Sequence, residues 1–227
     1  MNSCEIFGWS QLTWSKAFRN LHFNKCEVKT VLELGAGPLS QFGLIFSPAD
    51  VTISSYPKAV TEHIEAKVDK HKYPNVTFKT MSIFDVAGKY DLIVMKSVLG
   101  GVCRDAAPNC HMKLIEKLIR NNLNEGGYLL TLDNGCSFFE FLLSRSGARK
   151  NKWKFFKPSE FHYFYNQKAV GFFAAFSLAS RFGRLGVWFD NCLFFLDLIT
   201  QFIHKNKHPT VIATLFYQSD FLGKKTI

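Results

Sequence analysis

The chain has 227 residues, of which 47% are hydrophobic and 20% charged, so it is long enough for one globular domain and too short for two comfortable ones. The longest charge-free stretch of its apolar C-terminal third, residues 169–180, is shorter than the roughly 20 apolar residues of a membrane helix, which excludes a spanning segment there. Six cysteines lie scattered without a C-x-x-C pair, and no charged-then-apolar leader opens the chain, so we expect a reducing, cytoplasmic setting.

The charge balance is basic, with 28 Lys and Arg against 18 Asp and Glu and a net charge of +10. Much of the excess lies in residues 145–157, "RSGARKNKWKFFK", where basic side chains alternate with Trp153, Phe155 and Phe156 and no acid occurs. Such a run is typical of a surface for nucleic acid, anionic lipid or a phosphorylated substrate, and equally of a solvated loop. Both interpretations stay open.

Short β-branched or apolar runs, bounded by Gly, Pro, Asn or Asp, alternate with helical patterns along the chain. The runs predict buried strands at residues 30–34, 51–55, 76–80, 91–95 and 128–132. Helices are expected at residues 57–71, with Val60, Ile64 and Val68 on one face, and at residues 110–123, with Met112, Ile115 and Ile119 on one face. Strands alternating with helices predict an α/β fold with a mainly parallel sheet covered on both faces.

The C-terminal third is rich in aromatic residues and poor in charge. We expect strands at residues 171–177 and 210–218, and between them an amphipathic helix at residues 186–203. The phenylalanines of this part suit the core or a lid that walls a substrate site. An alternative turns Arg181, Arg184 and the basic run toward anionic lipid headgroups.

The first strand runs directly into a glycine-rich turn, in the sequence "TVLELGAGPLSQFG". In a parallel sheet, glycines at this point let a ligand approach the backbone at the following helix N-terminus. A dinucleotide site needs G-x-G-x-x-G, but Ser40 occupies the third position and Pro38 removes a backbone donor. An acid followed by two glycines remains, and a carboxylate there suits a cationic part of a ligand; the three residues are Glu33, Gly35 and Gly37. The alternative is a plain strand-to-helix connection.

These residues resemble a known family. "VLELGAGPLSQFGL" is similar to the first motif of class I S-adenosylmethionine-dependent methyltransferases, and "KYDLIVMKSVLGGV" and "LNEGGYLLTLDNG" fall where that family has its fourth and fifth strands. A narrower likeness extends over "WSKAFRN", "PSEF", "GFFAAF" and "TVIATLFYQ". That set resembles methyltransferases encoded in bacterial capsule and O-antigen polysaccharide clusters.

The resemblance implies a Rossmann-like sheet of seven strands, mainly parallel, with helices on both faces and the last strand antiparallel. It further implies a single methyltransferase domain over residues 1–227, with a helical lead-in at 1–29, a cofactor-binding core at 30–134 and substrate-side helices, an insertion and the last strands at 135–227. The implied cofactor is S-adenosyl-L-methionine (SAM), and the implied acceptor is a hydroxyl of a sugar or glycan precursor. An anionic membrane surface and nucleic acid are the other partners that the basic charge of the chain allows.

Position by position, the resemblance implies that the cofactor's amino-acid end lies against Glu33, Gly35, Ala36 and Gly37. The family usually has an acid at the end of strand two for the ribose hydroxyls, and here that position falls on Ser54 or Ser55, with Tyr56 as a further contact. A serine offers neutral hydrogen bonds where a carboxylate accepts charge-assisted ones.

The adenine edge falls on Ser82, with Ile83 and Phe84 as an apolar wall, unless Asp85 takes that role. At the end of strand four, Lys96 and Ser97 are further cofactor-site candidates. Lys96 could anchor the substrate or lie beside the methionine carboxylate of the cofactor. The alternative is that its side chain simply points to water.

Methyltransferases of this fold that act on nucleobase amino groups resemble one another in an N/D-P-P-Y/F tetrad after the fourth strand. This chain lacks the tetrad, so we do not expect a base nitrogen as the target. A hydroxyl acceptor must lose a proton, and the candidate bases are Asp105 and His111, although a lone histidine at such a position is more often structural. Asp133 with Asn134, and His162, are further candidates. Two alternatives remain, an RNA-directed methyltransferase and a binding or scaffold protein with a degenerate cofactor site.

Overall fold

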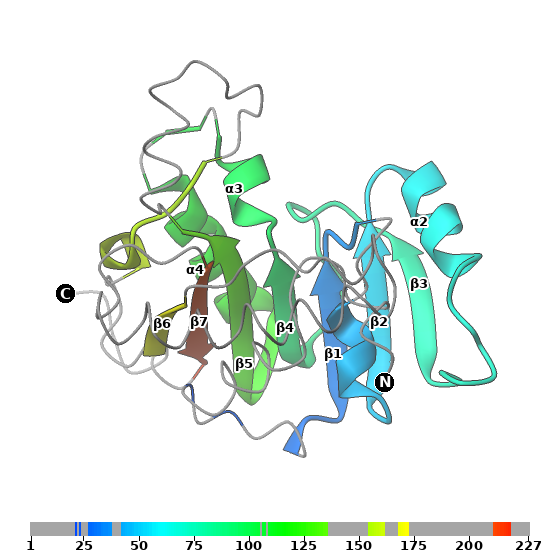
Figure 1. The fold of residues 1–227 in the computed structure, drawn as a ribbon. Coiled ribbons are helices and arrows are strands. Elements are labelled where there is room, and N and C mark those ends of the chain that lie inside the picture. Colours follow the sequence, from blue (N-terminus) through cyan, green and yellow to red (C-terminus); the bar gives the residue numbers. More distant parts are fainter. Residues whose placement is uncertain are drawn as a thin grey trace, which may run out of the picture.

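The structure is a computed structural model that describes residues 21, 23, 27–37, 42–104, 106–107, 109–135, 154–161, 168–172 and 211–218. Within them, seven strands form one sheet in the order β3-β2-β1-β4-β5-β7-β6 (Figure 1). The strands are β1 (Thr30–Leu34), β2 (Asp50–Ser55), β3 (Val76–Thr80), β4 (Tyr90–Lys96), β5 (Leu123–Asn134), β6 (Lys168–Phe172) and β7 (Val211–Tyr217). The predicted α/β, Rossmann-like sheet is confirmed.

All strand pairs from β3 to β5 are parallel, whereas β7 runs antiparallel to both β5 and β6. The last strand is therefore antiparallel, as expected. Because parallel strands end at the same edge of a sheet, the residues after β1, β2, β4 and β5 all meet at one edge (Figure 1). That edge carries the glycine turn and the residues proposed from the sequence.

The helical elements cover both faces of the sheet. They are η3 (Phe42–Phe46), α2 (Lys58–Glu65), α3 (Leu99–Val102), α4 (Cys110–Asn122) and η4 (Pro158–Phe161). Alternate residues of each strand point to opposite faces, so Val31 packs in a cluster with η3 while Leu32 packs in a cluster with α4 and the aromatic pair Phe156 and Phe161. Each cluster has fully buried aliphatic and aromatic side chains.

Helix α2 and strand β5 differ most in length from the prediction. Helix α2 ends at Glu65 and not at residue 71, because the Asp69 carboxylate accepts the His71 amide at 3.0 Å and so favours a turn over another helical turn. Strand β5 begins at Leu123, five positions before the expected start at 128. Its early part contains a register shift against β4 and Gly126 at φ 74°, a conformation that glycine adopts without strain.

Several sequence-based expectations lie outside the described residues. These are the helical lead-in before residue 21, the helix at residues 186–203, Asp105, His162 and most of the basic run. Strand β6 begins at Lys168, three residues before the strand expected at 171–177, and overlaps it at residues 171–172, while residues 173–177 are likewise outside. Within the described part of the chain, no helix is long and apolar enough to cross a membrane.

Candidate functional site

The two glycines of the turn after β1 have different surroundings, because Gly35 is tightly packed and Gly37 is not. Gly35 has φ +72°, and a Cβ built on it would lie 2.8 Å from Val98 Cγ2. Gly35 is therefore required by the fold itself. A Cβ built on Gly37 would meet no atom of the described residues within 4 Å. Among the described residues, nothing therefore fills the space at which a side chain of residue 37 would begin.

Glu33, the last but one residue of β1, is 1% exposed and points at the start of η3. Its Oε1 accepts the Phe42 amide at 3.0 Å and its Oε2 accepts the Gly43 amide at 2.7 Å. Burial raises the pKa of Glu33 to about 7, although both amides and the nearby charge of Lys96 lower it. The carboxylate thus fills the amide cluster that would otherwise attract an external anion.

The two serines at the end of β2 fasten the glycine turn. Ser54 Oγ donates to the Glu33 carbonyl at 2.8 Å, and Ser55 Oγ donates to the Ala36 carbonyl at 2.8 Å. The Ala36 amide in turn donates to the Ser54 carbonyl at 2.9 Å. Both hydroxyls are buried and have given their one hydrogen to the turn, so neither offers a donor to a ribose. Their role as ribose ligands stays a prediction, and only their acceptor lone pairs could serve it.

Exposed aromatic side chains lie beyond β2 and β3. Tyr56 follows β2 directly and is 72% exposed, and Phe84, four residues after β3, is 56% exposed. They are the large hydrophobic residues that the described part of the chain leaves in solvent. Ser82 accepts the Phe84 amide at 3.3 Å, Ile83 is half-buried and Asp85 is exposed. These side chains remain available for a flat apolar ligand at the outer end of the site.

Lys96 and Ser97 lie where the central strand β4 ends. Glu33 pairs with Val94 in register, and Lys96 stands two residues further along β4, so both side chains project from the same face of the sheet. Burial lowers the pKa of Lys96 to about 8, against the charge of Glu33, which raises it. Ser97 has φ 54°, and its amide donates to the Leu132 carbonyl at 2.7 Å, so the chain turns sharply there.

The candidate bases are separated from this face. His111, on α4, is 1% exposed and packs against the rings of Phe156 and Phe161 at centroid distances of 5.0 and 5.5 Å. Burial lowers its pKa, and its Nε2 lies 3.1 Å from the Glu160 carbonyl oxygen. This environment suits a neutral, packed imidazole and not a base that an acceptor can reach. Asp105 lies outside the described residues.

Asp133 was a further base candidate, and it is completely buried on the face covered by α3 and α4. Neither carboxylate oxygen has a hydrogen-bond partner of ordinary geometry among the described residues, although the amides of Leu99 and Gly100 lie near enough to lower its pKa. Burial outweighs them and raises the pKa to about 7. Asp133 is therefore inaccessible to an acceptor.

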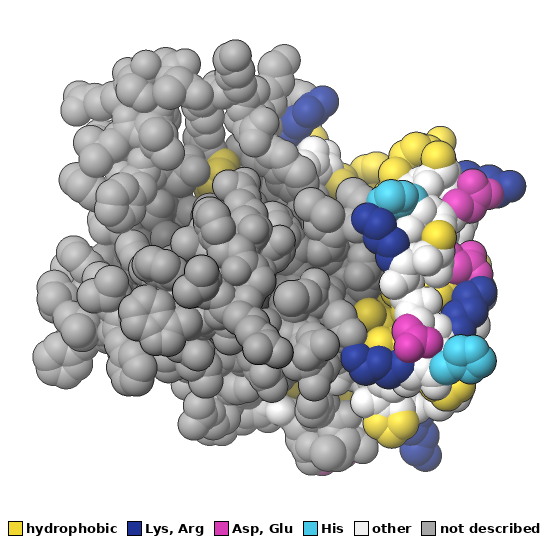
Figure 2. All heavy atoms as spheres, turned by 45° about the vertical axis from the view of Figure 1, so that its right-hand side comes forward, with side chains coloured by type: hydrophobic (Ala, Val, Ile, Leu, Met, Phe, Trp, Pro, Cys, Tyr) yellow, Lys and Arg dark blue, Asp and Glu magenta, His cyan; other side chains and the backbone are white. Residues whose placement is uncertain are grey.

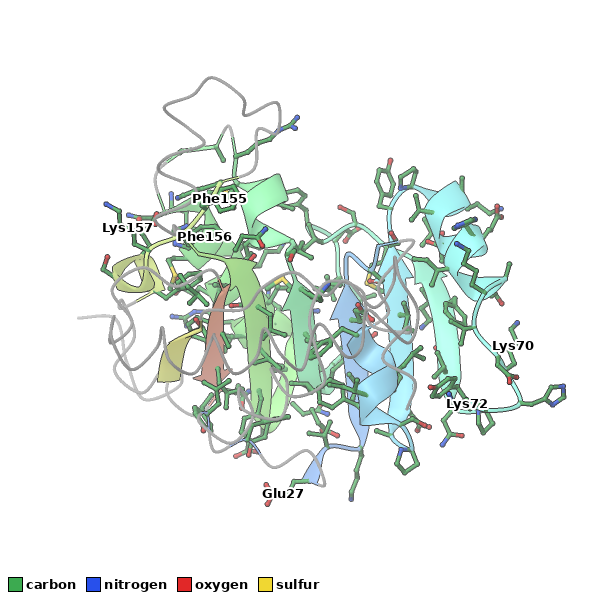
Figure 3. The ribbon with its side chains drawn as sticks, in the orientation of Figure 1. Glu27, Lys70, Lys72, Phe155, Phe156 and Lys157 are labelled. Carbon is green, nitrogen blue, oxygen red and sulfur yellow. The ribbon has the colours of Figure 1, made fainter. Side chains whose placement is uncertain are left out.

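The described end of the basic run packs beside α3. The Lys154 amide donates to the Gly100 carbonyl at 2.9 Å, and the Phe156 amide to the Asn134 carbonyl at 3.0 Å. Figure 3 shows Phe155, Phe156 and Lys157 at this end of the sheet, far from Lys70 and Lys72. This segment therefore borders the edge that carries the glycine turn.

Two relationships in this region were missed from the sequence. The serines act on the turn and not on a ligand, and Cys103 lies 3.1 Å from Cys110 between the sulfur atoms. The first depends on the register of β2 against β1 and the second on how α3 meets α4. Neither is encoded in a local pattern.

Comparisons with known proteins bear on the fold. No protein-family model matches the sequence, and no curated protein matches it. Among solved structures, coclaurine N-methyltransferase bound to N-methylheliamine and SAH (S-adenosylhomocysteine) is similar with a TM-score of 0.56 and 13% identity, over 91% of this chain and 72% of that one. Magnesium protoporphyrin IX methyltransferase from Synechocystis PCC 6803 with bound SAH gives 0.55 and 13%, over 90% and 82%.

A third structure, PigF with SAH, has a TM-score of 0.52 and 17% identity, over 69% of this chain and 50% of that one. This chain therefore matches about half the length of that protein. At such identities the likeness establishes the fold alone, which this chain shares with these methyltransferases. It does not extend to an acceptor or to a polysaccharide cluster.

Proposed function

We propose that this chain is a SAM-dependent methyltransferase whose acceptor is a hydroxyl of a sugar or glycan precursor. The observation that carries the proposal is the glycine turn at the carboxyl ends of the central strands, open beside Gly37 and fastened by Glu33, Ser54 and Ser55. The acceptor class rests on the sequence resemblance alone.

The residues fit this cofactor best at its amino-acid end. The space beside Gly37 admits a ligand against the backbone, and the buried carboxylate of Glu33 favours a cationic group there. Tyr56, Ser82 and Ile83 would hold the adenosine end, where an exposed aromatic ring and a half-buried aliphatic side chain are available. The carboxyl end of β2 contributes no carboxylate for the ribose, because it carries Ser54 and Ser55 while Asp50 lies at the opposite end of the strand. When bound, SAM supplies an electrophilic methyl group on a positively charged sulfur.

A phosphate-containing cofactor fits the same turn poorly. The amides of Phe42 and Gly43 are already satisfied by the Glu33 side chain, at 3.0 and 2.7 Å. A pyrophosphate at this position would meet a carboxylate and would find these two amides already occupied. The arrangement therefore favours a cationic ligand over a dinucleotide.

The residues of the chain have three tasks in such a transfer, which are to align the acceptor, exclude water and receive a proton. Lys96 stands at the end of the central strand, where cofactor and acceptor would meet, and its lowered pKa leaves part of it neutral near pH 8. Asp105 stays a candidate base from the sequence. The proposal assigns the proton to neither residue.

An RNA acceptor has less support. Figure 2 shows the face that carries α2 and β3, where described lysines alternate with acidic side chains and histidines. Lys58 pairs with Glu62 at 3.4 Å and Lys70 with Glu65 at 2.6 Å. The described residues of this face thus do not form the uniformly positive surface that binds the phosphates of an RNA backbone.

The test is transfer of a labelled methyl group. The full-length protein is incubated with methyl-labelled SAM and, separately, with cell-envelope glycans, RNA and proteins, and each fraction is counted before and after digestion by glycosidases, ribonuclease or protease. We expect label in a glycosidase-sensitive envelope fraction and none with the Gly37→Val variant. Label in RNA or protein would overturn the acceptor class, and failure to bind SAM in calorimetry would overturn the enzyme and favour the scaffold alternative.

A further inference from the structure

Two cysteine side chains face one another at the connection between α3 and α4. Cys103 is the residue directly after α3, and Cys110 is the first residue of α4. Their sulfur atoms are 3.1 Å apart, and both are free thiols. Cys103 is buried, while Cys110 is half-buried and so can be reached from solvent.

This geometry is close to that of a disulfide. A disulfide bond is about 2.05 Å long, so the two sulfurs need to approach by about 1 Å. They are linked by only six residues, 104–109, and the two helices that they end and begin, α3 and α4, both pack on the sheet, which keeps the thiols together. Such positioning gives an intramolecular reaction a high effective concentration.

We propose that Cys103 and Cys110 are a reversible oxidation site that forms a disulfide by exchange with a low-molecular-weight disulfide such as glutathione disulfide. The Cys110 thiolate attacks one sulfur of glutathione disulfide, forming a mixed disulfide and releasing one glutathione, which takes up the proton that Cys110 lost. The Cys103 sulfur then attacks Cys110 Sγ, gives up its own proton and releases the second glutathione. The two thiol hydrogens end on two glutathione molecules, and the protein pair is oxidised by two electrons.

The surroundings assign the order of these steps. Burial raises the pKa of Cys103 to about 12, with further increases from the hydrogen bond and charge of Cys110 and from Asp133, while Lys154 lowers it. Cys103 therefore stays protonated in the reduced protein, and the more accessible Cys110 reacts first. Once Cys110 is capped, its own contributions to the raised pKa of Cys103 disappear, which favours the second step.

The bond would fix a connection that borders the candidate site. Helix α3 follows the turn at Lys96 and Ser97, and the Gly100 carbonyl accepts the Lys154 amide at 2.9 Å. Oxidation thus ties together the ends of the segment 104–109. The inference rests on the two thiols and does not depend on the proposed methyl transfer.

Tryptic mapping tests the site directly. Full-length protein is equilibrated in buffers of decreasing ratio of reduced to oxidised glutathione, quenched with acid, alkylated and digested. Cleavage after Lys96, Arg104 and Lys113 puts the two cysteines in separate peptides, 97–104 and 105–113, each with one cysteine. We expect these peptides as a linked pair, two hydrogens lighter than their sum, and a melting temperature about 5 °C higher in the oxidised protein.

Single variants separate the two roles. Cys103→Ser should stop at the glutathione adduct on Cys110, and Cys110→Ser should leave Cys103 unmodified, neither variant showing the higher melting temperature. The proposal is overturned if the linked pair is absent in the most oxidising buffer, if another cysteine takes its place, or if Cys103 is glutathionylated in Cys110→Ser. Mapping of the unaltered protein decides the matter even if a variant fails to fold.

Discussion

The Ser55 hydroxyl donates a hydrogen bond to the Ala36 carbonyl at 2.8 Å, which ties the end of β2 to the glycine turn after β1. The position at which the resemblance implies a ribose-binding acid falls on Ser55 or its neighbour Ser54. In this chain the Ser55 side chain is hydrogen-bonded to the turn. The amide of Met81 and the hydroxyl of Thr61 donate to the Ser55 carbonyl at 3.1 and 3.2 Å. The buried hydroxyl of Ser55 thus has a hydrogen-bond acceptor in the turn, which a carboxylate at this position would not have.

Ser55→Asp should destabilise the protein and not tighten cofactor binding. The new carboxylate would be buried, would lose the donated hydrogen bond and would face the Ala36 carbonyl oxygen. A buried polar group without a partner costs roughly 1 to 3 kcal/mol, which lowers the melting temperature by about 2 to 12 °C in a domain of this size. Thermal melts and SAM calorimetry of the variant measure both quantities.

The matched control is Thr80→Asp. Thr80 pairs with Ser55 in register on β3, but its side chain is exposed, so an acid there should leave the melting temperature within about 1 °C. If Ser55→Asp binds SAM more tightly and melts no lower, the hydroxyl does face the ribose and the support role is wrong.

The sheet could be predicted from the sequence because each strand is a local signal. β1 and β3 match their predicted bounds, β2 begins one residue earlier than predicted, and β4 and β7 differ by one residue at each end. The position of the glycine turn and of Glu33 at the end of β1 could be predicted equally well, since the strand, the acid and the glycines are close together in the sequence. The end of α2 was not, because the Asp69 turn competes with helix by a side-chain contact that periodicity does not register.

The roles of separated residues could not be predicted in this way. Ser55 reaches Ala36 across nineteen positions of sequence, which requires the register of β1 against β2. His111 and Asp133 follow or end elements at the correct edge, but they point into the apolar face beneath α3 and α4. The sequence indicates the edge of the sheet at which a residue lies, and burial then decides whether a substrate can reach it.

The two glycines of the turn should respond differently to alanine. Gly35→Ala meets Val98 at 2.8 Å and adopts φ +72°, so we expect a loss of about 1 to 3 kcal/mol of stability. Gly37→Ala has open space among the described residues and should melt as the parent protein does, while binding SAM more weakly by tenfold or more. Thermal melts and calorimetry at one pH compare them. Unchanged SAM affinity in Gly37→Ala would place the cofactor elsewhere.

Asp133 should make the protein less stable as pH rises. Its pKa is raised from 3.8 to about 7 in the folded state, so between these values the folded protein keeps a proton that the unfolded chain releases. The stabilisation is complete below about pH 4 and is lost by about pH 7, an effect on the order of 2 to 4 kcal/mol. Asp133→Asn removes the titration, so its stability relative to the parent should increase from pH 4 to pH 7.

The comparison is made by denaturant unfolding at several pH values. Asp50→Asn serves as the control for the loss of one carboxyl group, because Asp50 is exposed at the start of β2. The expected signature is the change in slope and not the absolute stability, which the substitution itself can shift. Equal pH dependence in Asp133→Asn and the parent would show that this carboxyl titrates as an ordinary one.

Lys96 should set the pH at which the cofactor binds. Glu33 has a pKa of about 7, and the charge of Lys96 is one of the influences that lower it. If SAM binding needs the Glu33 carboxylate, affinity in the parent should fall as pH drops through about 7. Lys96→Gln removes the cation, so the pKa of Glu33 should rise and the midpoint of binding should move upward by roughly one pH unit. Calorimetric titrations with SAM and with SAH between pH 6 and 9 measure both midpoints, with Lys79→Gln, an exposed lysine of β3, as the control. A loss of affinity that is equal at every pH would instead mean that Lys96 contacts the cofactor itself, for example its carboxylate, and that the electrostatic link to Glu33 does not govern binding.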